Sequence, residues 1–282
     1  MKKLLVCLLI VVSLAVVSYA EPFLTDDLNL IGKNNLELGL SFSYGIDKWD
    51  WADNTAGSSI FGLTNLVFPI KYGISDKLDA QIEVPYRSWK SEIEFAGAKT
   101  ETNESGIGQI AAGVKYLFCN NLGAVVKIQT PTGDTEKMLG EGTDAGIFLV
   151  PSLKVAGLNL SANLGYIYKS KFKSIGIEYD PADPIVARIS AEYPYGNLSL
   201  IAEGQTQIFG KVKVAGASVD GTNGSTVDTV FGAQLVKDSL KFKLGFGLGL
   251  GKEDFKAGSP LFHFYDSWDW RIIFGSSYKF KI

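Results

Sequence analysis

Bulky apolar side chains alternate with polar or small ones along most of the chain. In residues 157–169, GLNLSANLGYIYK, every second residue from Leu158 to Tyr168 is apolar, and those between are mostly polar or glycine. A period of two indicates β-strands, because side chains along a strand point alternately to opposite faces of the sheet. The alternation predicts twelve strands, with ten or fourteen left open, at residues 35–46, 60–72, 76–90, 106–118, 121–131, 144–155, 157–169, 185–195, 197–209, 227–237, 239–251 and 268–282.

The connections between these predicted strands alternate between short and long. The short turns are at residues 73–76, 119–121, 156–157, 194–197 and 237–238. The long polar segments are at residues 46–59, 91–105, 132–143, 170–184, 210–226 and 252–267. Such regularity is typical of an up-and-down barrel with short periplasmic turns and longer outer loops. The expected fold class is therefore all-β, a transmembrane antiparallel β-barrel of about twelve strands.

A soluble sandwich or a lipocalin-like barrel is the alternative, because its strands alternate as well. The aromatic residues favour the membrane barrel, since they gather near strand ends as interfacial girdles do. The girdle beside the long loops is expected to contain Trp49, Trp51, Trp89, Trp268, Trp270, Tyr44, Phe61, Tyr86, Tyr168 and Phe172. The girdle near the short turns is expected to contain Tyr72, Tyr116, Phe118, Tyr193, Tyr195 and Tyr278.

The last predicted strand, WDWRIIFGSSYKFKI, keeps its apolar residues in phase up to Ile282. This resembles the C-terminal recognition signal of outer-membrane barrels, although their usual last residue is Phe. The resemblance implies the barrel-assembly machinery as a partner. Pro69, Pro85 and Pro151 fall inside predicted strands, and each removes a backbone donor, which predicts a bulge or a local kink.

The first twenty residues differ from the rest. Lys2 and Lys3 precede an apolar stretch that ends in Ser18-Tyr19-Ala20, the pattern of a secretory signal peptide at residues 1–20. Its removal would leave residues 21–34 as a periplasmic N-terminal segment and residues 35–282 as the barrel. Without Lys2 and Lys3, 25 basic residues face 30 acidic ones, a net charge of −5 that argues against a nucleic-acid partner.

Several segments resemble a known family. The opening EPFLTDDLNLIGKNNLELGLSFSYG and the later YGISDKLDAQIEVPY, GIGQIAAGVKYLF and KIQTPTGDTEKMLGEGTDAGIFLVPSLK resemble, in order, segments of the transporter family named for the MetA pathway of phenol degradation. The resemblance implies a Gram-negative outer-membrane barrel and a channel for small or aromatic compounds. It supplies neither a substrate nor functional residues.

If the apolar face meets lipid, the opposite face lines the lumen of the barrel. Bases outnumber acids on that face, which favours anions, because rings of charge set the selectivity of a pore. The alternative is that ion pairs fill a narrow interior, since twelve strands lie between filled eight-stranded barrels and open sixteen-stranded porins. The predicted pore-lining residues are Glu37, Lys71, Glu83, Arg87, Lys115, Lys127, Lys154, Arg188, Glu192, Glu203, Lys241, Lys243, Gly247, Gly249 and Arg271.

Two segments are predicted to shape a passage. In SLKFKLGFGLGLGK, residues 239–252, a stripe of glycines takes the lumen face above Lys241 and Lys243, which predicts vacant space above a positive constriction. Residues 21–33 either fold into the periplasmic mouth as a gate, with Asp26 and Asp27 near the lysines, or form a disordered lead-in.

Other chemistry finds little support in the sequence. His263 is the only histidine, no serine follows it two residues later, and no Gly-x-Ser-x-Gly element exists, so we expect neither catalytic residues nor an enzyme. With one histidine, and with Cys119 as the only cysteine outside the signal peptide, we expect no metal site and no cofactor. Acidic residues crowd the long loops, which predicts a soluble rim or one bridged to lipopolysaccharide by divalent cations.

The expected function is an outer-membrane channel or facilitator for small solutes, with aromatic or anionic compounds as candidates. Its expected partners are outer-membrane lipid, lipopolysaccharide, the barrel-assembly machinery and a small-molecule solute. The alternatives are a non-conducting structural or adhesive barrel and a surface enzyme.

Overall fold

The computed structural model describes residues 28–50, 57–95, 98–137, 139, 142–174, 176–218, 223–253 and 269–282. Within these residues the chain forms strands joined by turns and loops. The strands are β1 (Asn35–Asp50), β2 (Gly57–Ser75), β3 (Leu78–Phe95), β4 (Ala98–Ile107), β5 (Ala111–Cys119), β6 (Leu122–Gln129), β7 (Asp144–Val155), β8 (Leu158–Lys169), β9 (Phe172–Ser174), β10 (Ile177–Asp180), β11 (Ile185–Tyr195), β12 (Leu198–Phe209), β13 (Lys213–Val214), β14 (Ala217–Ser218), β15 (Gly224–Lys237), β16 (Leu240–Glu253) and β17 (Trp270–Lys281).

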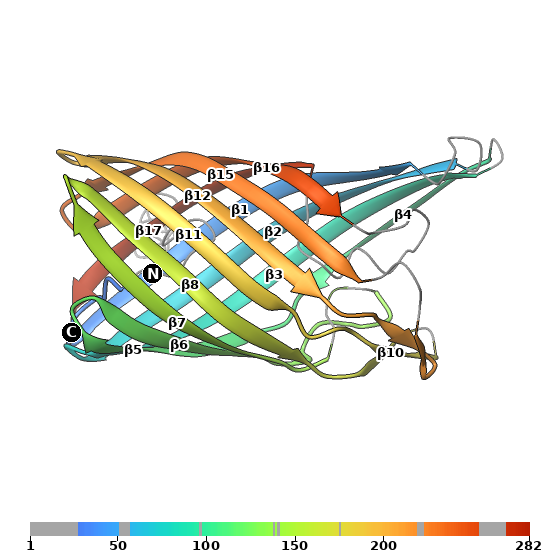
Figure 1. Cartoon of the computed structure of the whole chain (residues 1–282), viewed down its shortest axis with the longest axis horizontal. Coiled ribbons are helices and arrows are strands. Elements are labelled where there is room, and N and C mark those ends of the chain that lie inside the picture. The colour runs from blue at the N-terminus through green and yellow to red at the C-terminus, as the bar shows by residue number, and fades with distance from the viewer. Residues whose placement is uncertain are drawn as a thin grey trace, which may run out of the picture.

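One antiparallel sheet closes on itself to form a barrel (Figure 1). Its strands follow the order β2, β1, β17, β16, β15, β12, β11, β8, β7, β6, β5, β3, and the pairing of β2 with β3 closes the ring. β4 and β5 pair with successive parts of β3 and share one position in the wall. The described part of the barrel therefore has twelve strand positions, which confirms the predicted fold.

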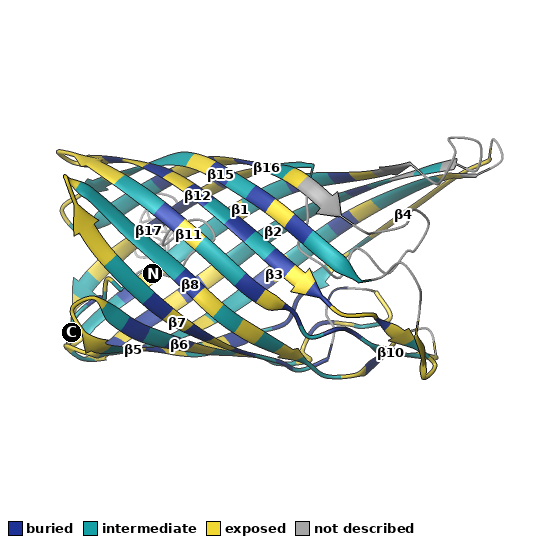
Figure 2. Ribbon diagram, in the orientation of Figure 1, coloured by how far each residue is buried: buried dark blue, intermediate teal, exposed yellow. Residues whose placement is uncertain are grey.

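Large apolar side chains cover the outer surface, and polar side chains fill the inner one. Figure 2 shows buried and exposed residues alternating along most strands. In β8, Leu164 is 56% exposed whereas its neighbour Asn163 is completely buried. A closed barrel pairs every backbone group within the wall, and its apolar outer face then meets lipid. These two properties are those of a protein in an outer membrane and confirm the expected localisation. Among the described residues, no helix is long and apolar enough to cross a membrane.

The tight turns lie at one end of the barrel together with the C-terminus (Figure 1). We assign this end to the periplasm, because outer-membrane barrels have their short turns on that side. Two of these turns place non-glycine residues at positive φ, Ala156 at 49° and Asp238 at 56°. The opposite, outer end carries the long connections. The predicted alternation of short and long connections thus separates the two ends of the barrel.

At the outer end, β1 to β4 extend beyond the other strands (Figure 1). The prediction of loops at residues 46–59 and 91–105 is therefore wrong, since strand covers most of both ranges. In β4, the residues from Ala98 to Asn103 are all exposed. Beyond the bilayer both faces of a sheet meet water, so this extension has polar residues on both faces and lacks the alternation that marks a membrane strand. A second, small sheet of β9, β10, β13 and β14 also lies at this end.

The aromatic girdles are confirmed in part. Near the short turns, the predicted residues are all exposed on the outer surface: Tyr72, Tyr116, Phe118, Tyr193, Tyr195 and Tyr278. At the outer end, Tyr86 and Tyr168 are exposed, and the rings of Tyr44 and Trp270 meet edge to face at 5.7 Å. Phe61, Trp89 and Phe172 are buried, so their assignment to this girdle is wrong. The side chain of Trp49, and residues 51 and 268, lie outside the described residues.

The three strand prolines interrupt the hydrogen-bond ladder on one side. Pro69 lies where the pairing of β1 with β2 skips from Leu38–Ile70 to Ser41–Val67 in an unchanged register. Pro151 lies in a similar gap between β7 and β8. Pro85 lies where β3 passes from β5 to β4, and there the register changes by one residue. The register change opposite Pro85 agrees with the predicted bulge or kink, whereas at Pro69 and Pro151 the ladder is interrupted without a bulge.

Candidate functional site

The lumen holds the predicted pore-lining residues on the inner face of the wall. Glu37, Lys71, Lys115, Glu203 and Lys243 are each less than 6% exposed. Others line two cavities inside the barrel. The cavity nearer the outer end is lined by Glu83, Lys127 and Arg188. The cavity nearer the periplasm is lined by Lys154, Glu192, Lys241 and Lys243. The inward position of these side chains agrees with the strand period, and their role in lining a conducting pore stays a prediction.

Acids and bases oppose one another on the wall formed by β17, β1, β2, β3 and β5. Glu37 on β1 is the register partner of Lys279 on β17 and of Lys71 on β2. Asp79 on β3 is likewise opposite Lys115 on β5. Directly opposed side chains lie within reach of each other, and opposite charges there stabilise the sheet. Charge on this side of the lumen is therefore largely matched within the wall.

Glu37 is the most deeply buried carboxylate of this wall, at 1% exposure. It accepts a hydrogen bond from the hydroxyl of Ser277 on β17. The Nζ of Lys241 on β16 lies 3.6 Å from the same carboxylate oxygen, Oε1. A buried carboxylate is stable only when a donor and an opposite charge lie beside it, and the neighbouring strands β17 and β16 supply them here.

The chain before the first strand enters the lumen. The backbone N–H of Ile31 donates to Oδ2 of Asp79 at 2.8 Å, and that of Asn34 donates to the carbonyl of Gly73 at 2.8 Å. A Cβ at Gly73 would lie only 1.9 Å from the Gly32 carbonyl oxygen, so the glycine lets the two backbones touch. Residues 28–34 are therefore attached to the inner wall, and the gate at residues 21–33 stays a prediction. Asp26 and Asp27 lie outside the described residues.

Leu28 crosses the lumen to an apolar patch on the opposite wall. It packs with Ile167 against a cluster of buried residues, Val125, Phe148, Val150 and Val186. Its Cδ2 lies so close to Gly123 that a Cβ there would be 2.7 Å away. Apolar side chains facing an otherwise polar lumen leave water when Leu28 covers them, which favours the contact. Leu28 lines one cavity of the lumen, and Phe148 and Ile167 line a second, so the contact lies between the two.

The cavity on the periplasmic side of Leu28, called here the lower cavity, has a volume of about 410 Å³. Its wall includes Lys154, Lys241, Lys243 and Lys279, with Glu192 as the one acidic residue among the described lining. The Glu192 carboxylate accepts a hydrogen bond from the Asn159 amide at 3.2 Å. Leu28 and Leu30 close the cavity from the side of the N-terminal segment.

The cavity on the outer side, called here the upper cavity, has a volume of about 210 Å³. Lys169 and Asp144 both line it, and their Nζ and Oδ2 atoms are 3.5 Å apart. The Nε–H of Arg188 donates to Oε1 of Gln205 at 2.7 Å, and the guanidinium lies 5.2 Å from the centre of the Phe148 ring. The charges here are nearly balanced and held by neighbours.

The connection between β6 and β7 folds into the outer end of the lumen. Leu139 packs there against Phe61 and Trp89, whose rings stack at 5.7 Å. The indole N–H of Trp89 donates to the carbonyl of Lys137 at 2.8 Å. Phe61 and Trp89 occur in the inward phase of β2 and β3, which explains why they are not girdle residues. The sequence positions near the strand ends were right, but the side of the wall was wrong.

The glycine stripe of β16 does not leave the predicted empty space at Gly247. A Cβ at this position would lie 2.7 Å from Cγ and 2.9 Å from Nε of Arg271, its register partner on β17. The glycine therefore makes room for a neighbouring arginine side chain, and vacant space at this point is a wrong prediction. Gly249 is a half-buried position on the same face.

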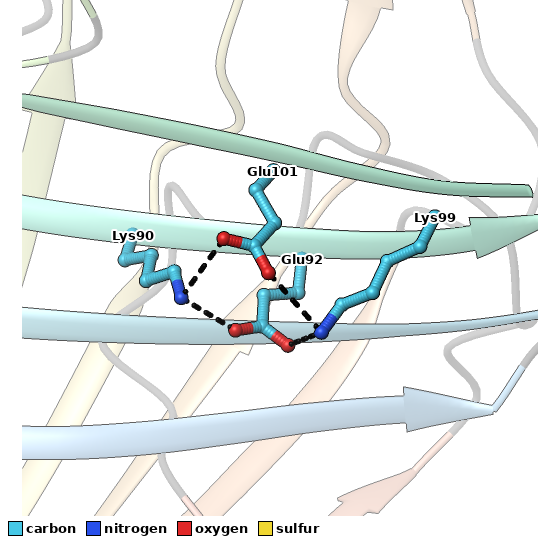
Figure 3. Close-up of polar contacts among 4 residues, drawn as sticks. All are labelled: Lys90, Glu92, Lys99 and Glu101. Carbon is cyan, nitrogen blue, oxygen red and sulfur yellow. Dashed lines mark hydrogen bonds and ion pairs between the residues drawn. The ribbon is translucent and has the colours of Figure 1, made fainter.

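The outer extension of β3 and β4 carries a ring of four charges on its outward face (Figure 3). Lys90 contacts Glu92 at 2.7 Å and Glu101 at 3.2 Å, and Lys99 contacts the same two at 2.8 Å and 3.2 Å. Hydrogen bonds from Lys90 and then Lys99 lower the pKa of Glu92 to about 2. Four charges cannot face hydrocarbon, so the ring lies beyond the bilayer.

No cluster of three or more potential metal ligands occurs among the described residues. His263 lies outside them. Cys119 is an exposed free thiol at the end of β5, next to the turn to β6. The described interior therefore offers charges, amides and apolar side chains around two cavities.

The sequence profile of the family described as "Putative MetA-pathway of phenol degradation" matches residues 25–262. The chain belongs to this family. The match begins three residues before Leu28, so it includes the described N-terminal segment as well as most of the barrel.

Solved outer-membrane barrels share the fold of this family member. An outer membrane channel from Pseudomonas putida F1 has a TM-score of 0.69 and 15% identity, over 93% of this chain and 100% of that chain. The translocator domain of the autotransporter NalP from Neisseria meningitidis has a TM-score of 0.57 and 11% identity, over 90% and 91%. The transport unit of the autotransporter AIDA-I from Escherichia coli has a TM-score of 0.55 and 11% identity, over 93% and 95%. A comparison with curated protein sequences finds no match.

Proposed function

We propose that this member of the family is a passive outer-membrane channel for small solutes, gated by residues 28–34. The observation that carries the proposal is the contact of Leu28 with the apolar patch on the wall. It lies between two cavities in a polar lumen, and it is made by a segment that is not part of the barrel wall. Removing one segment would join the cavities without opening the sheet.

The predicted pore-lining residues would border the joined passage. A solute entering from outside would meet Lys127 and Arg188 in the upper cavity, pass the apolar patch, and leave past Lys154 and Lys241 in the lower one. Charged groups on such a path decide which ions pass, because they attract one sign and repel the other. Partly apolar solutes would also be tolerated at the patch, since Val125 and Phe148 offer no polar groups to lose.

Planar-bilayer recording of the purified protein tests the proposal. Replacing Leu28 with Ala removes about 1–2 kcal/mol of apolar contact, which raises the open fraction about five- to thirtyfold if the segment is mostly seated. Leu200→Ala is the matched control, because this leucine is exposed on the lipid face of β12. A protein in which neither the wild type, nor Leu28→Ala, nor a deletion of residues 21–33 conducts would be a non-conducting structural barrel.

The partners expected beyond lipid and solute belong to the same proposal. The barrel-assembly machinery would engage β17, whose exposed Ile272, Phe274 and Tyr278 support a terminal recognition strand. Lipopolysaccharide would meet the charged outer extension, where Glu94 is exposed and is the register partner of Lys99 in the ring of charges. The proposal includes no catalysis: the barrels that share this fold are a channel, a translocator domain and a transport unit.

A further inference from the structure

The lower cavity is lined by more basic than acidic side chains. Four lysines from three strands line it: Lys154 from β7, Lys241 and Lys243 from β16, and Lys279 from β17. Glu192 is the one acid among the lining residues that the structure describes. Positive charges placed around one space raise the local concentration of anions, because the low-dielectric wall focuses their field.

The nearby acids already have partners. Glu37 accepts from Ser277 and contacts Lys241. Asp79 accepts from the backbone of Ile31, and Glu192 accepts from the Asn159 amide. No described residue makes an ion pair with the ammonium groups of Lys154 and Lys279. These two lysines are exposed to the space at the mouth of the cavity, where a solute would meet them.

The same cavity also has an apolar side. Leu28 and Leu30 approach it from the N-terminal segment, and Ile201, 6% exposed, approaches it from β12. Serine, asparagine and glutamine side chains fill the remaining wall, including Ser161, Ser190 and Gln234. Small-molecule sites of about 300–1,000 Å³ combine an apolar surface with a few polar groups that fix orientation, and the lower cavity falls within that size range.

From this arrangement we infer that the lower cavity binds a small organic anion. The ligand class is a carboxylate with a short apolar tail: the carboxylate lies among the lysines, and the tail lies against Leu30 and Ile201. The inference rests on the proposed function, because it assigns the class of solute held on the periplasmic side of the gate. The upper cavity offers no comparable site, since Asp144 and Glu83 stand beside its three bases.

Calorimetric titration of the full-length protein in lipid nanodiscs tests the site. The probes are hexanoate, which has both charge and tail, acetate, which lacks the tail, and hexylammonium, which reverses the charge. We expect hexanoate to bind more tightly than acetate, and hexylammonium not to bind. Equal affinity for hexanoate and hexylammonium would overturn the inference.

Two sets of variants locate the bound probe. Replacing Lys154 and Lys279 together with Gln weakens hexanoate binding by up to about fivefold per lysine, the effect of one partly exposed charge contact. Leu30→Ala weakens hexanoate binding and leaves acetate binding unchanged. The matched control is Lys237→Gln, because Lys237 is an exposed lysine at the same end of the barrel that does not line the cavity. An equal loss in the control places the anion elsewhere and overturns the inference.

Conductance recorded from the same preparations separates the two proposals. If the protein conducts but does not bind hexanoate, the proposed channel function stands and the organic-anion site is overturned. If the protein binds hexanoate through Lys154 and Lys279 but conducts under no condition, the organic-anion site stands and the proposed channel function is overturned.

Discussion

The upper and lower cavities are built by one barrel wall, yet their charges differ. In the upper cavity Asp144 lies 3.5 Å from Lys169, and Glu83 adds a second carboxylate against three bases. In the lower cavity four lysines face one glutamate. The difference shows that a count of charges along the inner faces of the strands does not describe the lumen, because the acids lie beside the bases in the upper cavity and largely away from them in the lower one.

The N-terminal segment accounts for part of this difference. It lies against the acid-containing wall, where Asp79 receives the N–H of Ile31. Glu37, on the same side of the barrel, is enclosed by Ser277 and Lys241. The lower cavity lies beside the segment, and lysines line the part of its wall that the segment does not cover. The segment thus both separates the cavities and leaves the lower one positive.

The largest expected effect on this division comes from Gly73. A Cβ here would lie 1.9 Å from the Gly32 carbonyl oxygen, so Gly73→Ala is incompatible with the seated segment. We expect the segment to leave the wall, the cavities to join, and the open fraction in bilayer recordings to rise about tenfold or more.

Gly204→Ala is the control for this change, because a Cβ at that wall position would meet nothing closer than 3.6 Å. If Gly73→Ala and Gly204→Ala both conduct like the wild type, the N-terminal segment does not separate the cavities.

Asp144→Asn should make the upper cavity resemble the lower one. The change leaves Lys169, 11% exposed at its side chain, without the carboxylate 3.5 Å away. Leaving a largely buried charge without its partner costs about 1–3 kcal/mol of folding free energy. We expect a lower unfolding temperature by circular dichroism and a reversal potential shifted toward anions. The control is Asp238→Asn, in an exposed turn, which should change neither the unfolding temperature nor the reversal potential. An unshifted reversal potential in Asp144→Asn would show that the upper cavity does not control ion selection.

The smallest expected effect concerns the ring of charges on the outer extension, which touches neither cavity. Because the pKa of Glu92 is about 2, below its ordinary value of 4.5, the ionised form is favoured in the folded hairpin. The contribution is complete above pH 4.5 and is lost as the pH falls toward 2. We expect hydrogen exchange in β3 and β4 above the bilayer to accelerate only below about pH 4, and Glu92→Gln to abolish that step. A step that survives in Glu92→Gln belongs to another group, of which Glu101 is the nearest, because hydrogen bonds from Lys99 and Lys90 lower its pKa as well.

The sequence was sufficient for the barrel but not for its contents. Strand period, turn spacing and the inward residues followed from local alternation, which a membrane barrel requires along every strand. The packing of Leu28 against the cluster of Val125, Phe148, Val150 and Val186 joins residues far apart in the chain, and no local pattern indicates it. The alternation Leu28-Asn29-Leu30 was a usable signal, since it resembles a short strand facing a wall. Gly247 was misjudged because the side chain that fills its space comes from another strand.

The burial of Glu37 bears on how the ring of strands is completed. This carboxylate lies on the first strand, while its donors lie on the last two, so its environment exists only after the two ends of the sheet have met. A pairing of β1 with β17 shifted by one residue would turn Glu37 toward lipid, and a shift by two that brings it opposite Lys281 would move it away from Ser277. Both errors leave a carboxylate without its donor or in hydrocarbon, at a cost of several kcal/mol. The burial of one acidic side chain at the β1–β17 seam therefore favours the correct register over shifted ones when the barrel closes.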